Sequence, residues 1–110
     1  MSEPVTTFTG MTDPKLRLLD FTAAWCAPCR AMTPILTGLA RDYAGRLELQ
    51  EIDVDHEQVL AQQYNVRSMP TLVLVRDGRE VGRVVGLRPR NFVAGMIDRA
   101  LAGDVAIASP

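Results

Sequence analysis

The sequence is poor in the residue types that mark most binding surfaces. Its 110 residues include one histidine, one lysine and one tryptophan, and aromatic residues make up 5%. The formal net charge is −1, so no excess of positive charge is available for nucleic acid or an anionic membrane. No run approaches the ~18 apolar residues that cross a bilayer. We therefore expect a protein that binds neither nucleic acid nor membrane.

The shortage of metal ligands limits what the two cysteines can do. A zinc site uses about four ligands, whereas the chain offers Cys26, Cys29 and one histidine, His56. A metal site would need carboxylates or a second copy of the chain, so we favour a redox pair without metal. Residues 1–4 lack a cationic start and an apolar segment, which predicts a cytoplasmic protein. There, a close cysteine pair is more often catalytic or metal-binding than structural.

The two cysteines lie in the run Trp25-Cys26-Ala27-Pro28-Cys29, after an apolar stretch and at the head of a helix-like stretch. Unpaired N–H groups and the dipole at a helix start favour a thiolate, which makes Cys26 the nucleophile. Cys29, one turn further, can then resolve a mixed disulfide. Pro28 is compatible with a helix start, where its missing N–H would have no partner.

Hydrophobic periodicity predicts one domain of alternating strands and helices. We expect a short leader at 1–15, a core at 16–101 and a weakly patterned tail at 102–110. Pro34 should kink the first long helix, and Asp77-Gly78 predicts a tight turn. The predicted strands are 5–8, 16–22, 47–54, 71–76 and 80–85, and the predicted helices are 26–43, 57–64 and 92–101.

Further motifs occur in a distinctive order around the cysteine pair. They are Leu19-Asp20-Phe21, Pro34, Asp53-Val54-Asp55, the run from Tyr64 to Thr71, Asp77-Gly78 and Val85-Gly86. In this order and near these spacings the chain resembles the thioredoxin family over about residues 16–101. The resemblance implies an α/β thioredoxin fold, with a central mixed sheet of four to five strands flanked by helices. Residues 9–15 are too few for the usual first crossover helix, so we expect that helix to be shortened or missing.

The resemblance also implies roles for individual residues. It implies a cis Met69–Pro70 bond beside the dithiol. Asp20 interrupts an apolar strand, and burying a lone carboxylate is costly; in thioredoxins an Asp here exchanges a proton with the second cysteine. Each of these roles has a purely structural alternative. Pro70 would then be a plain turn proline, Asp20 an exposed or capped residue at the strand end, and Gly86 a strand terminus. The predicted catalytic residues are Cys26, Cys29 and Asp20, and the predicted substrate-binding residues are Trp25, Ala27, Pro28, Met69, Pro70, Gly86 and Leu87.

Three residues depart from the family pattern. Thr22 stands where an aromatic residue is common, Ala27 where glycine is, and Glu51 where lysine is. Counting by twos from Leu47 places Glu51 on the apolar face of its strand, and the resemblance implies that this strand lies next to the one that carries Asp20. Two acids would then share a small volume, so we expect the pKa of Asp20 to lie above that of a free aspartate.

The implied function is that of a monomeric dithiol–disulfide oxidoreductase that reduces protein disulfides. It would need no cofactor and would receive electrons from a thioredoxin-reductase-like partner. A disulfide isomerase or oxidase is the alternative enzyme, since it differs only in reduction potential. A binding protein that holds a client or a metal without turnover is the alternative from another class.

Overall fold

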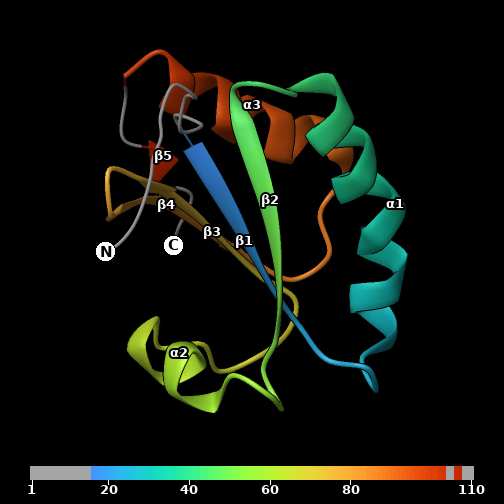
Figure 1. Ribbon diagram of the computed structural model, residues 1–110. Helices are drawn as coiled ribbons and strands as arrows, with labels where there is room; N and C mark the ends of the chain where they lie inside the picture. The colour runs from blue at the N-terminus through green and yellow to red at the C-terminus, as the bar shows by residue number, and fades with distance from the viewer. Residues whose placement is uncertain (1–15, 104–105, 108–110) are drawn as a thin grey trace.

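A computed structural model of the chain describes residues 16–103 and 106–107. It confirms the predicted α/β architecture, with strands and helices alternating along most of the chain (Figure 1). The strand predicted at 5–8 and the shortened helix predicted at 9–15 lie outside the described residues. The elements are β1 (Leu16–Thr22), α1 (Ala27–Asp42), β2 (Leu47–Asp53), α2 (Gln58–Gln63), β3 (Thr71–Arg76), β4 (Arg79–Val85), α3 (Arg90–Leu101) and β5 (Ala106–Ile107).

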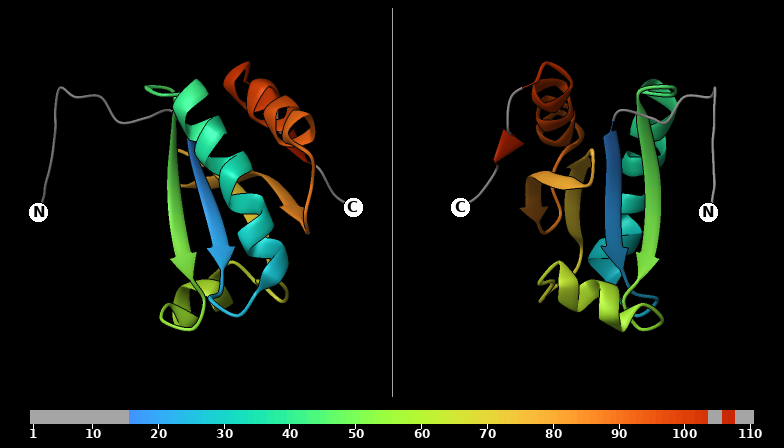
Figure 2. Two further views of the ribbon diagram at one scale, coloured as in Figure 1. Left: turned by 90° about the vertical axis from the view of Figure 1, so that its right-hand side faces the viewer. Right: turned by 60° about the vertical axis from the view of Figure 1, so that its left-hand side comes forward.

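The strands form one mixed sheet in the order β2-β1-β3-β4-β5. β1 pairs in parallel with β2 and antiparallel with β3, and β3 and β4 form an antiparallel hairpin. The views in Figure 2 show α1 and α3 on one side of the sheet and α2 at the end toward which β1 and β2 run. The tight turn predicted at Asp77-Gly78 is confirmed, and the two residues have φ of 53° and 78°, as a type I′ hairpin turn requires.

Side chains of β1 divide between two cores, because successive residues of a strand point to opposite faces. Leu16 and Leu18 pack in the core beneath α1 and α3. Leu19 and Phe21 pack in a second core with residues of α2. Both faces of β1 are therefore covered, which accounts for its nearly continuous apolar sequence.

The C-terminal part of the chain contains two features that were not predicted. Within the tail, β5 pairs in parallel with Gly82 and Arg83 of β4; a two-residue strand is too short to show periodicity. The helix predicted at 92–101 begins at Arg90, and its Phe92 is 39% exposed. The Arg88 guanidinium stands 5.1 Å from the ring centroid of Phe92. The buried residues of α3 are Val93, Ala94, Met96, Ile97 and Ala100.

α1 is one continuous helix from Ala27 to Asp42, with Pro34 inside it. No helix in the described part of the chain is both long enough and apolar enough to cross a membrane.

The C-terminal end of α1 is joined to α3 by Tyr43, which is 8% exposed and whose hydroxyl donates to the Asp98 carboxylate at 2.5 Å. An ion pair between Arg90 and Asp42, at 2.6 Å, links the same two helices.

Tyr43→Phe should lower the free energy of unfolding by about 1–2 kcal/mol, because the ring stays and a hydrogen bond to a carboxylate is lost. Urea denaturation at neutral pH measures this difference. The control is Tyr64→Phe, since the Tyr64 ring packs on Phe21 and its hydroxyl bonds to none of the described residues. Equal losses in the two variants would contradict a role for the hydroxyl of Tyr43.

Candidate active site

The cysteine pair lies where β1 gives way to α1. Cys26 is the N-cap of α1, with an extended backbone at φ −96° and ψ 108°. Its Sγ accepts a hydrogen bond from the Cys29 N–H at 3.2 Å. The two sulfurs are joined in a disulfide, with their Cα atoms 5.3 Å apart. Pro28 sits in the first turn, where its missing N–H leaves nothing unsatisfied. The predicted position of the pair at a helix start is confirmed.

This position distinguishes the two sulfurs chemically. Cys26 and Cys29 are almost equally buried, at 5% and 4% exposure, so solvent access does not separate them. Only Cys26 precedes the helix, where free N–H groups and the helix dipole stabilise a negative charge. Once the bond is reduced, the Cys29 N–H points at the Cys26 sulfur and favours its thiolate. The geometry therefore supports Cys26 as the nucleophile.

A loop from the other side of the sheet packs against the disulfide. Met69 contacts the buried cluster of Ala23, Cys26 and Cys29, and the Met69–Pro70 bond is cis, as the resemblance implied. The Pro70 carbonyl accepts a hydrogen bond from the Gly86 N–H at 2.8 Å.

Gly86 has a φ of 95°, a conformation that favours glycine. Its hydrogen bond to Pro70 holds Gly86 and Leu87 beside the Met69–Pro70 loop. The structure thus brings Met69, Pro70 and Gly86 together, with Met69 against the dithiol and Leu87 next to Gly86 in the chain.

The surroundings of the disulfide are apolar and open to solvent. Trp25 is 65% exposed and Leu87 is 50% exposed, and Ala27 and Pro28 are exposed as well. In the described part of the chain, neither the N–H nor the carbonyl of Met69 makes a hydrogen bond. An extended polypeptide could use such free backbone groups for pairing.

Two residues that the sequence analysis did not assign to the site help to hold it in place. The Trp25 indole N–H donates to the Asp55 carboxylate at 2.9 Å, which fixes the ring to the loop after β2. The Arg30 guanidinium donates to the Ala24 carbonyl at 2.9 Å, which ties α1 back to the end of β1. Asp55 belongs to the acidic strand end seen in the sequence, but spacing alone does not say which acid meets the tryptophan.

Asp20 is buried beneath α1, with an exposure of 6%. It lies on the same face of β1 as Leu16 and Leu18, and Cys29 lies on the buried side of α1. Its carboxyl makes no hydrogen bond to any described residue. Burial, followed by the nearby charge of Glu51, raises the pKa of Asp20 to about 6. The predicted burial and the predicted rise in pKa are both confirmed.

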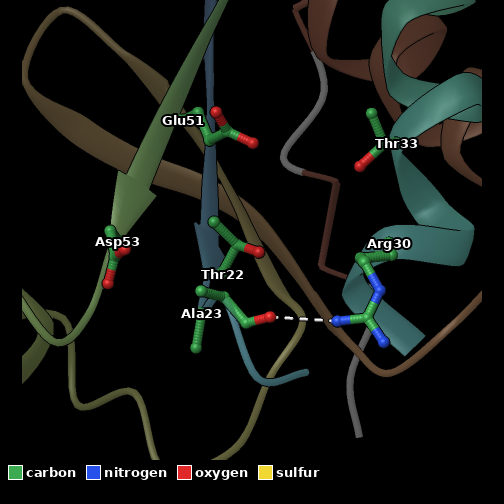
Figure 3. A pocket seen from close by; sticks show the side chains of 7 residues that line it. Thr22, Ala23, Arg30, Thr33, Glu51 and Asp53 are labelled. Atoms are coloured by element: carbon green, nitrogen blue, oxygen red, sulfur yellow. Dashed lines mark hydrogen bonds between the residues drawn. The ribbon is translucent and has the colours of Figure 1, made fainter. Parts of the chain in front are cut away.

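Glu51 pairs in register with Asp20, so it lies beside the strand that carries Asp20, as predicted. Its side chain is exposed, because the face that is apolar at Leu47 and Leu49 opens into a pocket toward the dithiol end. The pocket, shown in Figure 3, has a volume of about 280 Å³. It is lined by Thr22, Ala23, Ala24, Arg30, Thr33, Glu51 and Asp53.

The described residues contain no group of three or more His, Cys, Asp or Glu side chains placed to hold a metal ion. His56 pairs with Asp53 at 3.3 Å. The two sulfurs are joined in a disulfide at the start of α1, which is the arrangement of a thiol–disulfide exchange site.

Comparison with known proteins gives the same result. The family model "Thioredoxin" matches residues 7–99. This chain belongs to the thioredoxin family. A thioredoxin from Staphylococcus aureus is 38% identical over 94 residues, which cover 86% of this chain and 90% of the relative. Membership and the cysteine pair together make the chain a dithiol–disulfide oxidoreductase, a protein-disulfide reductase of the thioredoxin type.

Solved thioredoxin structures share the fold. The germline-specific thioredoxin Deadhead of Drosophila melanogaster has a TM-score of 0.75 and 38% identity, covering 79% of this chain and 82% of its own. Fasciola hepatica thioredoxin has a TM-score of 0.73 and 36% identity, covering 77% and 80% respectively.

Asp20→Asn should stabilise the fold at neutral pH. A carboxyl whose pKa is raised in the folded state, from ~4 to about 6, destabilises that state increasingly as pH climbs through this window. The loss corresponds to roughly 3 kcal/mol by pH 7. Urea denaturation of parent and variant across this range should show the variant's advantage growing and then levelling off. Asp77→Asn, on the exposed turn, should give a difference independent of pH, and a similarly flat difference for Asp20→Asn would refute the assignment.

Asp55→Ala should release the Trp25 ring, because it removes the only acceptor that the indole has among the described residues. Trp25 is the one tryptophan of the chain, so its fluorescence anisotropy reports the ring directly and should fall. Asp55→Asn keeps an acceptor oxygen and should retain most of the parent anisotropy. Unchanged anisotropy in Asp55→Ala would mean that packing alone orients the ring.

Proposed function

We propose that this thioredoxin-family protein works as a reductant of protein disulfides, with Cys26 as the attacking residue and Cys29 as the resolving residue. The observation that carries the proposal is the hydrogen bond from the Cys29 N–H to the Cys26 Sγ at the start of α1. It identifies the sulfur that receives helix-end stabilisation, and a stabilised thiolate is the species that attacks.

The reaction follows from this assignment. The Cys26 thiolate attacks one sulfur of the client disulfide, which forms a mixed disulfide and expels the first client thiolate. Cys29 then loses its proton, for which Asp20 is the buried acceptor. The Cys29 thiolate attacks the Cys26 sulfur and expels the second client thiolate. Two electrons have passed to the client, whose thiolates take protons from water, and the chain is left with the Cys26–Cys29 disulfide.

Client binding is assigned to the surface around the disulfide. The free N–H and carbonyl of Met69 can pair with an extended client strand. The exposed side chains of Trp25 and Leu87 flank that strand with apolar area, while Ala27 and Pro28 leave the sulfurs approachable. Pro70 and Gly86 hold this surface together through their hydrogen bond.

The proposal includes the source of electrons and the setting. Thioredoxins as a family are reduced by a reductase, and we assign a partner of that kind to this chain. A reducing compartment such as the cytoplasm suits a pair that must be a dithiol to act. We also propose that the protein acts as a monomer, which leaves the exposed surface around Trp25 and Leu87 free to bind clients.

Cys29→Ser should trap client proteins as stable mixed disulfides on Cys26, because attack remains possible while resolution is lost. The variant is mixed with oxidised insulin, and the adduct is mapped by mass spectrometry after non-reducing separation. The matched control is Cys26→Ser, which keeps one thiol of similar burial but should trap at least about tenfold less client. Stronger trapping through Cys29 in that control would reverse the assignment.

A turnover assay separates catalysis from mere binding. The parent protein should accelerate insulin reduction by dithiothreitol, and both serine variants should lose this acceleration. A parent protein that forms mixed disulfides without accelerating reduction would instead be a thiol-dependent binding protein.

A further inference from the structure

The face of the sheet that α1 covers changes from apolar to polar along the strands. At one end β1 and β2 place leucines side by side, with Leu16 beside Leu47 and Leu18 beside Leu49. Toward the dithiol the same two rows place Asp20 beside Glu51 and Thr22 beside Asp53. All of these side chains share one face, because residues two apart on a strand point the same way. The polar end of the face is where the pocket opens.

The pocket is large and polar enough to hold water. A volume of about 280 Å³ exceeds the roughly 10–15 Å³ of accessible space that one water molecule needs. Its walls carry the hydroxyls of Thr22 and Thr33 and the carboxylates of Glu51 and Asp53. Figure 3 shows Glu51 on the β2 wall of the pocket and Arg30 on the opposite, α1 wall.

Asp20 lies next to this pocket, because Thr22, two residues further along β1, and Glu51, its partner on β2, both line it. It is buried and lacks a hydrogen-bond partner in the described chain, so its ionisation depends on the charges and the water nearby. The Arg30 guanidinium is bonded to the Ala24 carbonyl, which holds it away from Asp20. Glu51 has no ion-pair partner among the residues that the structure describes.

We infer that Glu51, the cross-strand partner of Asp20 in the wall of the pocket, is a positioning residue that sets the pH range in which Asp20 can take the proton of Cys29. The inference rests on the proposed function, because it assigns Asp20 to the resolving step. The like charge of Glu51 delays ionisation of Asp20, and pocket water limits how far burial can delay it. Thr22 keeps the pocket open, since a larger side chain there would displace that water.

Three elements pack against Asp20, and two of them carry charged or titratable groups. β2 contributes Glu51 and, one pair further, Asp53. α1 contributes Cys29 and Arg30. β3, on the other side of β1, presents the apolar side chain of Leu72. Of these groups, Glu51 is the direct cross-strand neighbour of Asp20, which makes it the one to change.

The test follows the two chemical steps separately. The reduced protein is mixed with a stoichiometric amount of dithiodipyridine, which releases one thiopyridone when Cys26 attacks and a second when Cys29 resolves the mixed disulfide. The rate of the second release is measured by stopped flow against pH, and the Asp20 carboxyl carbon is titrated by NMR. The first release is an internal control that does not involve Asp20.

Glu51→Gln should move the rising limb of the second step, and the Asp20 titration, to lower pH by about half a unit, and Glu51→Lys by about one unit or more. Thr22→Trp should move both to higher pH, because it displaces the pocket water. The first release should keep its pH dependence in all three variants.

Glu48→Gln and Glu48→Lys are the matched controls, since Glu48 is exposed on the opposite face of β2 and pairs with Arg17. The inference would be overturned if the rising limb of the second release and the Asp20 titration kept their pH in the Glu51 variants. It would also be overturned if both moved equally in the Glu48 variants. If Thr22→Trp does not fold, the Glu51 series decides. A parent protein that shows no second release would overturn the proposed function instead, so the two failures are distinguishable.

Discussion

The start of α1 is the feature on which the chemistry of this protein depends. A strand that is buried on both faces ends at Thr22, and the chain turns through Ala23 so that the Cys26 N–H bonds the Ala23 carbonyl at 3.1 Å. The helix then begins with the Cys26 sulfur as its cap. Because β1 and α1 pack through the large core under α1 and α3, this junction is held by the most buried part of the molecule. The reactive sulfur is therefore placed by packing rather than by a mobile loop.

The same junction contains an unfavourable group. Asp20 occupies a position that a leucine could fill, and its raised pKa shows that the fold destabilises the ionised form. Natural proteins tolerate such local conflicts at functional sites, where an optimally stable residue would lack the chemistry.

The elements with strong local signals could be predicted from the sequence. β1 and β3 were predicted with their observed bounds, because continuous apolar runs between turn residues have few alternatives. The turn at Asp77-Gly78 follows from the need for positive φ at both positions. β5 could not be predicted, since two residues carry no period and their pairing with β4 depends on the completed sheet.

The site was predictable to a similar degree. The cysteine pair and the helix start are local in sequence, whereas the cis bond at Pro70 and the role of Asp20 came from family resemblance. The face of β2 that carries Glu51 was predicted from alternation and its position beside the Asp20 strand from family resemblance, but its exposure was not predicted. Exposure depends on where α1 ends its coverage of the sheet, which is a property of the packed structure. The bond from Trp25 to Asp55 likewise joins residues thirty apart in the chain.

The central claim is that the Cys26–Cys29 pair donates electrons to protein disulfides. The reduction potential of the pair tests this claim most directly, measured by equilibration with glutathione of known composition and alkylation of the free thiols. The account predicts a value near that of reducing thioredoxins, about −270 mV, and below that of protein disulfide isomerase at about −180 mV. A value near −120 mV, typical of a disulfide oxidase, would contradict it, because such a pair would withdraw electrons from its clients.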